Sequence, residues 1–257
     1  MLSRISILAL LSLASSVAAF PQPTPVVGRD VGEDTVSVPG NAISVADYWK
    51  TAMPEVTEAP SADAAAAAQR FTIKVTNKLG RAIQTKHALN KGFADIVSGD
   101  KGQGVMQNGA QSQFVVPVGW AGNLAVVENG GGRTFLGDES LIEGSFVKQG
   151  SSPKFDIDVS YVTGFSLPIT CTCDGKTVTG CNKYLWSLSK CPNDNGKGSC
   201  KNPHRDIKGS ATPFFKPCQH AAYTYPDDDG ANANGLCKGN TITCCVGTSC
   251  PKNPKQS

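Results

Sequence analysis

The sequence predicts an all-β protein in which an antiparallel β-sandwich core is followed by a lobe of loops that disulfide bonds hold together. Short segments of alternating apolar and polar residues lie between residues 71 and 162, separated by turns rich in Gly and Asn, and none keeps a helical period. All ten cysteines come later, after residue 170. Strands at short, regular intervals are typical of sandwiches and barrels.

Residues 1–19 are expected to be a secretory signal peptide. A basic lead ends at Arg4, an apolar run follows to Val17, and small residues occupy the positions before a cut after Ala19. The apolar run is too short to span a membrane. The protein is therefore expected to be secreted, to the extracellular space or the cell wall.

Residues 20–69 are expected to form a flexible leader or propeptide. This segment is biased towards Pro and Ala, and it holds seven acidic residues against two basic ones. Residues 70–257 hold 21 basic and 14 acidic residues. These bases are dispersed and no basic cluster is interleaved with aromatic residues, so nucleic acid is not an expected partner.

The strands are predicted from alternation. Phe71, Ile73 and Val75 alternate with polar residues, as in a half-buried strand. Further strands are predicted over five segments with a similar alternation, and all six strands together make a core of roughly 100 residues. The five segments are 82–89, 112–118, 122–129, 140–148 and 154–162.

The cysteine-rich region should rely on cross-links, because loops rich in Gly, Pro, Asn and Lys bury little apolar surface. Ten cysteines in an oxidising compartment fit five disulfides. Zinc is not expected, since the spacing lacks repeated C-x-x-C and the three histidines are scattered; neither a metal nor a cofactor is predicted. Residues 212–226 have the aromatic content to pack on the sandwich as a short helix or strand, giving one compact, monomeric unit over 70–257. The ten are Cys171, Cys173, Cys181, Cys191, Cys200, Cys218, Cys237, Cys244, Cys245 and Cys250.

Several segments, taken in order, resemble thaumatin-like proteins, the family that includes osmotin. They are "FTIKVTN" (71–77), "SLIEGSF" (140–146), "DVSYVTGFSLPI" (158–169), "PFFKPCQHAAYTYPDDD" (213–229) and "CKGNTITC" (237–244). The resemblance implies a flattened sandwich flanked by disulfide-rich loops, with an acidic cleft that in many members binds β-1,3-glucan. It also implies the pairs Cys171–Cys237, Cys173–Cys218 and Cys181–Cys191, and assigns no partners to Cys200, Cys244, Cys245 and Cys250.

The resemblance carries the cleft acids onto Glu143 and Asp158. Glycoside hydrolysis usually needs two carboxyl groups, one protonated and one ionised, and these two lie on strands expected to be neighbours. Thr163 stands where the family has another acid, which weakens the repulsion that would keep one carboxyl protonated. Asn123 stands where an arginine is expected, although Arg133 could approach from the glycine-rich loop. The alternative is that both acids are ordinary outward-facing strand residues.

Other candidate binding residues have equally plain structural alternatives. The last cleft acid is one of Asp227, Asp228 and Asp229, which also fit a solvated turn. Three aromatic residues are candidates for stacking on sugar rings, or else for packing: Trp120, Tyr223 and Tyr225. His220 is expected to make structural hydrogen bonds rather than to act as a base.

The function expected from these residues is binding of β-1,3-glucan or another wall polysaccharide by a secreted protein, in fungal wall remodelling during spore germination. One alternative is a weak endo-β-1,3-glucanase with antifungal activity, which would use Glu143 and Asp158. Another is a surface adhesin that engages a host-cell protein. The departures at Thr163 and Asn123 favour binding over catalysis.

Overall fold

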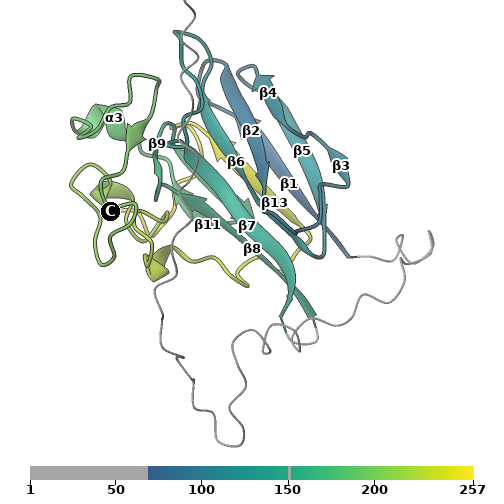
Figure 1. Ribbon diagram of the computed structural model, residues 1–257. Coiled ribbons are helices and arrows are strands. Elements are labelled where there is room, and N and C mark those ends of the chain that lie inside the picture. The colour runs from purple at the N-terminus through teal and green to yellow at the C-terminus, as the bar shows by residue number, and fades with distance from the viewer. Residues whose placement is uncertain (1–68, 150–151) are drawn as a thin grey trace, which may run out of the picture. The chain divides into compact units, whose positions relative to one another are not determined.

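The computed structural model describes residues 69–149 and 152–257 (Figure 1). The expected signal peptide and, apart from Gln69, the expected leader lie outside the described residues. In the part that is described, no helix has the length and apolar character needed to cross a membrane.

The described chain is a disulfide-rich all-β fold, as predicted. One sheet has the order β11-β10-β13-β1-β5-β3 and the other β4-β2-β6-β7-β8, with a small third sheet of β9 and β12. The strands are β1 (Arg70–Asn77), β2 (Ile83–Leu89), β3 (Ser98–Gly99), β4 (Gln103–Met106), β5 (Gln111–Pro117), β6 (Trp120–Glu128), β7 (Ser140–Gln149), β8 (Ser152–Ser160), β9 (Gly164–Phe165), β10 (Ile169–Cys173), β11 (Lys176–Cys181), β12 (Cys200–Lys201) and β13 (Thr241–Val246).

The two large sheets pack face to face, as a sandwich does (Figure 1). Aromatic rings bridge them: Phe71 of β1 lies 6.0 Å from Phe146 of β7, and Phe114 of β5 lies 6.3 Å from Trp120 of β6, between ring centroids. All six strands expected between residues 71 and 162 are present, with ends within two residues of the prediction. Alternation located them because every second side chain enters this core.

The sandwich departs from a purely antiparallel pattern at one place. β13, close to the C-terminus, runs parallel to β1, with Thr72 opposite Thr241, and antiparallel to β10 on its other side. The strand expected at 237–244 is thus displaced to Thr241–Val246. Parallel neighbours need a long connection, which here is the whole intervening chain.

The loop lobe contains short helices only: α3 (Leu185–Leu188), η1 (Lys216–Cys218) and η2 (Asp229–Ala231). The segment expected to pack on the sandwich, 212–226, does so as a turn around η1. Phe214 and Phe215 are buried there, and Phe214 meets Phe165 edge-on.

All ten cysteines form disulfides, and the three expected pairs are wrong. The bonds are Cys171–Cys244, Cys173–Cys237, Cys181–Cys218, Cys191–Cys200 and Cys245–Cys250. Strand register explains the first correction, since Cys171 lies directly opposite Cys244 between β10 and β13. Neighbouring residues on a strand face opposite ways, so Cys244 and Cys245 take different partners.

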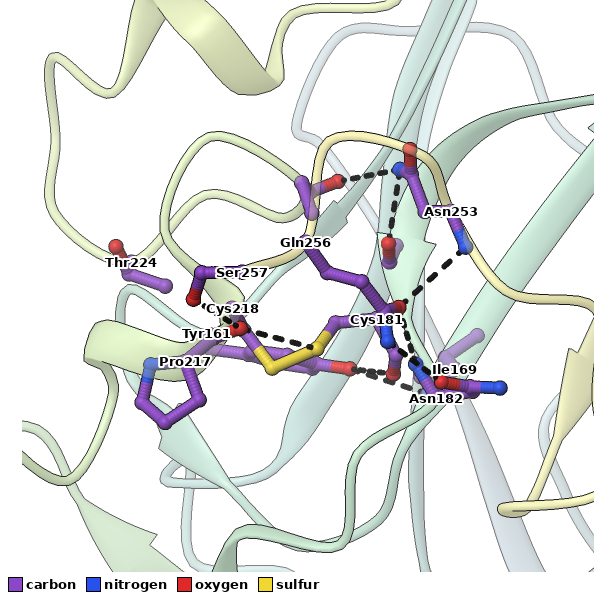
Figure 2. The surroundings of a disulfide bond; sticks show 12 residues. Tyr161, Ile169, Cys181, Asn182, Pro217, Cys218, Thr224, Asn253, Gln256 and Ser257 are labelled. Carbon is purple, nitrogen blue, oxygen red and sulfur yellow. Dashed lines mark hydrogen bonds between the residues drawn. A yellow bond between two sulfur atoms is a disulfide. The ribbon is translucent and has the colours of Figure 1, made fainter.

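The C-terminal tail closes over the Cys181–Cys218 disulfide (Figure 2). Asn253 donates from Nδ2 to the carbonyl oxygens of Gly180 and Ala221, at 2.9 and 3.2 Å. Beneath them the fully buried Tyr161 hydroxyl donates to the carbonyl of Cys181 and accepts from the amide of Ile169, both at 3.1 Å. Tyr161 thus joins the end of β8 to β10 and β11.

Replacing Tyr161 with phenylalanine is expected to destabilise the protein by about 2 kcal/mol, because a buried carbonyl and a buried amide would each lose their partner. Urea unfolding followed by circular dichroism measures the loss. Phe165→Leu, which alters buried packing at the ring that Tyr161 meets edge-on, separates lost hydrogen bonds from lost contact. An unchanged unfolding midpoint for Tyr161→Phe would contradict the role given to the hydroxyl.

Candidate functional site

The two acids expected in the cleft lie directly opposite each other. Glu143 of β7 pairs with Asp158 of β8, and Asn123 of β6 lies opposite Glu143 on the other side. Directly opposed residues have Cβ atoms about 4.5–5.5 Å apart. The expectation that these strands are neighbours is confirmed.

The face on which these acids lie follows from the alternation of β8. Phe155, Ile157 and Val159 are buried in the sandwich core. The residues between them therefore face away from the core, towards the side on which the loop 223–233 crosses the sheet. The site is thus built on the outer face of the five-stranded sheet, at its β8 edge.

A third acid joins the pair: Asp156, two positions before Asp158 and on the same face. We name Glu143, Asp156 and Asp158 the acidic cluster. Sequence reasoning missed Asp156, although its signal was present in "FDIDVS", where two aspartates alternate with buried apolar residues. The resemblance to thaumatin-like proteins assigns a role to Asp158 and none to Asp156.

The surroundings of Asp158 favour the protonated form of its carboxyl group. Its side chain is 8% exposed, and the backbone amide of Ala233 donates to Oδ1 at 2.8 Å. Burial, and after it the negative charge of Asp156, raise the pKa of Asp158 to about 8. A hydrogen bond between the side chains of Asp156 and Asp158 adds to the rise in the pKa of Asp158.

The other two members of the acidic cluster are also perturbed by burial. Burial raises the pKa of Glu143, against the effect of a hydrogen bond from Ser160. Burial likewise raises the pKa of Asp156. Oδ1 of Asp156 is buried and finds no N–H or hydroxyl donor among the residues that the structure describes.

Of the three aromatic residues predicted to stack on sugar rings, Tyr223 is the one that lies beside the acidic cluster. Its backbone extends the edge of β8, because Tyr223 N donates to Val159 O at 2.9 Å and Tyr161 N donates to Tyr223 O at 2.7 Å. Burial, followed by the charge of Asp158, raises the pKa of the Tyr223 hydroxyl to about 12. The residue is only half-buried, so part of its surface remains exposed.

The other two aromatic candidates do not offer a face to a ligand. Trp120 is 3% exposed and packs in the sandwich core against Phe114. Tyr225 is 5% exposed, and its hydroxyl accepts a hydrogen bond from Gln219. The prediction that Trp120 and Tyr225 stack on sugar is therefore corrected to packing, because rings on inward-facing positions are covered.

Of the three consecutive aspartates, Asp228 is a structural residue. It is fully buried and accepts hydrogen bonds from the hydroxyl of Thr224 at 2.8 Å and from the backbone amide of His220 at 3.1 Å. His220 Nδ1 lies 2.7 Å from the same carboxyl group, in the structural role expected for this histidine. Asp228 thus stabilises the turn, and the prediction that it binds a ligand is corrected to this structural role.

The two flanking aspartates differ from each other. Asp227 accepts a hydrogen bond from the amide of Gly209, which ties the turn to the neighbouring loop. Asp229 is exposed, and its negative charge contributes to raising the pKa of Tyr223. Of the three, Asp229 is therefore the one whose charge acts at the candidate site.

The residues expected to complete the cleft lie elsewhere. Thr163 donates its hydroxyl to the carbonyl of Glu139, at the start of the loop lobe. Arg133 pairs with Glu128, 3.6 Å away, so the expectation that it approaches the cleft acids is wrong. The like charge that Thr163 lacks is supplied by Asp156.

One group of residues has the spacing of metal ligands, but it cannot use its sulfur atoms. Cys173, Asp174 and Cys237 lie close together, and the two cysteines are bonded to each other. A thiolate is the form of cysteine that binds a metal. In the oxidised protein this group is a disulfide beside a carboxylate.

A comparison with known protein families gives no match, and neither does a comparison with curated protein sequences.

Proposed function

We propose that the acidic cluster and Tyr223 bind a neutral cell-wall polysaccharide, β-1,3-glucan, in a secreted thaumatin-like protein. The observation that carries the proposal is that Glu143 lies directly opposite Asp158, whose pKa is raised to about 8 by burial and by the charge of Asp156. A protonated carboxyl group donates a hydrogen bond and its ionised neighbour accepts one, as the hydroxyl groups of a sugar require. The half-buried ring of Tyr223 adds an apolar surface beside them.

The disulfides support the cellular setting. Five disulfide bonds are typical of extracellular proteins, because thiols stay reduced in the cytosol. A place in the cell wall, with a role in fungal wall remodelling during germination, belongs to the proposal. The resemblance in segments such as 213–229 supports the choice of glucan.

Weak hydrolysis of the same glucan is the second candidate, and the protonation of Asp158 favours it. Asp158 would donate its proton to the departing glycosidic oxygen, while Glu143 would act as base or nucleophile. In the sequence, the absence of an acid at Thr163 made hydrolysis the less favoured prediction. Asp156 removes that objection, because its charge helps to keep Asp158 protonated.

The test is Glu143→Gln in the mature protein, which keeps the shape of the side chain and removes its charge. Co-sedimentation with insoluble β-1,3-glucan is expected to weaken about tenfold, the cost of about one charge-assisted hydrogen bond. Release of reducing sugar from laminarin is measured in parallel. Sugar release abolished by Glu143→Gln makes the protein a glucanase, whereas binding without release makes it a binding protein.

Asp206→Asn is the matched control, since Asp206 is highly exposed and outside the acidic cluster. It should bind like the unmodified protein. If the unmodified protein neither sediments with glucan nor releases sugar, the proposal fails and a protein partner, such as one on a host cell, becomes the better hypothesis.

A further inference from the structure

A pocket lies where β6 ends, away from the acidic cluster. Its volume is about 370 Å³, and it is enclosed by the end of β6, the glycine-rich loop that follows, the region of α3 and the loop 194–198. Sites for small molecules have volumes of about 300–1,000 Å³. The side chains that decide its chemistry are Glu128, Arg133, Tyr184, Trp186 and Asp194.

Two aromatic rings form one wall and are held in place. Trp186 donates from Nε1 to the carbonyl of Ser166 at 3.2 Å and meets Phe214 edge-on at 5.8 Å. Its polar atom is thereby occupied inside the protein. Tyr184 precedes α3 and accepts the amide of Ser187 at its carbonyl, at 3.0 Å. Both side chains are only half-buried, so part of each ring faces the pocket.

The charged side chains at the pocket balance one another. Glu128 accepts from Arg81 at 2.7 Å through Oε1, and its Oε2 lies 3.6 Å from Arg133. Arg133 also donates to the carbonyl of Gly130, at 3.3 Å. Asp194 accepts the amide of Gly196 at 2.8 Å. The carboxylates of Glu128 and Asp194 thus offset the guanidinium charges of Arg81 and Arg133.

These walls select a ligand class. Carboxylates on the lining disfavour an anion, and a purely apolar ligand would remove water from the guanidinium and carboxylate groups without replacing the hydrogen bonds of that water. The hydroxyl groups of a neutral ligand can donate hydrogen bonds to the carboxylates and accept them from the guanidinium groups. The apolar face of such a ligand can lie on Trp186 or Tyr184. Sugar rings have these properties.

We propose that this pocket binds a neutral sugar unit, as a site separate from the acidic cluster. Glu128 lies five positions beyond Asn123 on β6, which at about 3.4 Å per residue separates the two sites by roughly 17 Å along the strand. The inference depends on the pocket alone and holds whether or not the acidic cluster binds glucan.

The test uses the fluorescence of Trp186 in the mature protein carrying Trp49→Phe. The other tryptophan, Trp120, is buried in the core, so a change caused by a ligand reports on Trp186. Titration with laminarihexaose, chitohexaose and mannohexaose is expected to give a saturable change with at least one. Tyr184→Ala should weaken that affinity about tenfold, and Leu188→Ala, at the exposed end of α3, should leave it unchanged.

Arg133→Gln provides the same test if thermal melting shows that Tyr184→Ala has lost its fold. A response that persists in Glu143→Gln assigns the ligand to this pocket, even if glucan sedimentation fails. The proposal is overturned if none of the three oligosaccharides gives a saturable change, or if neither Tyr184→Ala nor Arg133→Gln weakens it.

Discussion

Asp158→Asn is expected to make the protein more stable at neutral pH, by about 2 kcal/mol or more. The folded protein keeps a proton on Asp158 up to a pKa of about 8, whereas the unfolded chain releases it near the ordinary value of 3.8. Between these values the unfolded state binds fewer protons, so the free energy of unfolding falls as pH rises. Asparagine removes this cost and still accepts the hydrogen bond from Ala233.

Urea unfolding at pH 4, 6 and 8 measures this effect. The unmodified protein should lose stability across the series, and the difference in favour of Asp158→Asn should grow with pH. Asp206→Asn, at an exposed position, should follow the unmodified protein. A variant that is less stable than the unmodified protein at pH 8 would show that Asp158 is ionised in the folded state. Gain of stability together with loss of glucan binding would indicate that the carboxyl group is kept for function.

Removal of the Cys171–Cys244 disulfide, by replacing both cysteines with alanine, is expected to cost about 4 kcal/mol. The bond closes a chain segment of 73 residues, and the entropy that a cross-link removes from the unfolded chain grows with the length of that segment. It also lies within the six-stranded sheet, between β10 and β13. Thermal and urea unfolding of the double variant measure the loss.

The Cys245–Cys250 bond is the matched control, because it closes only five residues. Replacing that pair with alanine should cost about 2 kcal/mol, half as much. Equal losses for the two pairs would contradict the dependence on chain length and would point to packing around the sulfur atoms as the main contribution.

Only part of the candidate site could be predicted from the sequence. Glu143 and Asp158 were selected by the resemblance to thaumatin-like proteins, and alternation placed them on two strands that were expected to be neighbours. Asp156 belongs to the same predicted strand, but its effect on the pKa of Asp158 depends on how close the two carboxyl groups lie. Trp120 and Tyr225 fit a sugar site by residue type, and only burial in the folded chain shows that their rings are covered.

The sequence by itself determined that the described chain is a disulfide-rich β-sandwich, since alternation and cysteine number are local properties of the chain. It did not show that β10, β11 and β13, which carry five of the ten cysteines, belong to the six-stranded sheet rather than to the loop lobe. Only the tertiary structure decided which cysteines pair, because that depends on the register of β10 against a strand some 70 residues away. It also decided the raised pKa of Asp158, which is produced by burial and by a neighbouring charge. Both are consequences of non-local contacts, which residue patterns along a strand do not specify.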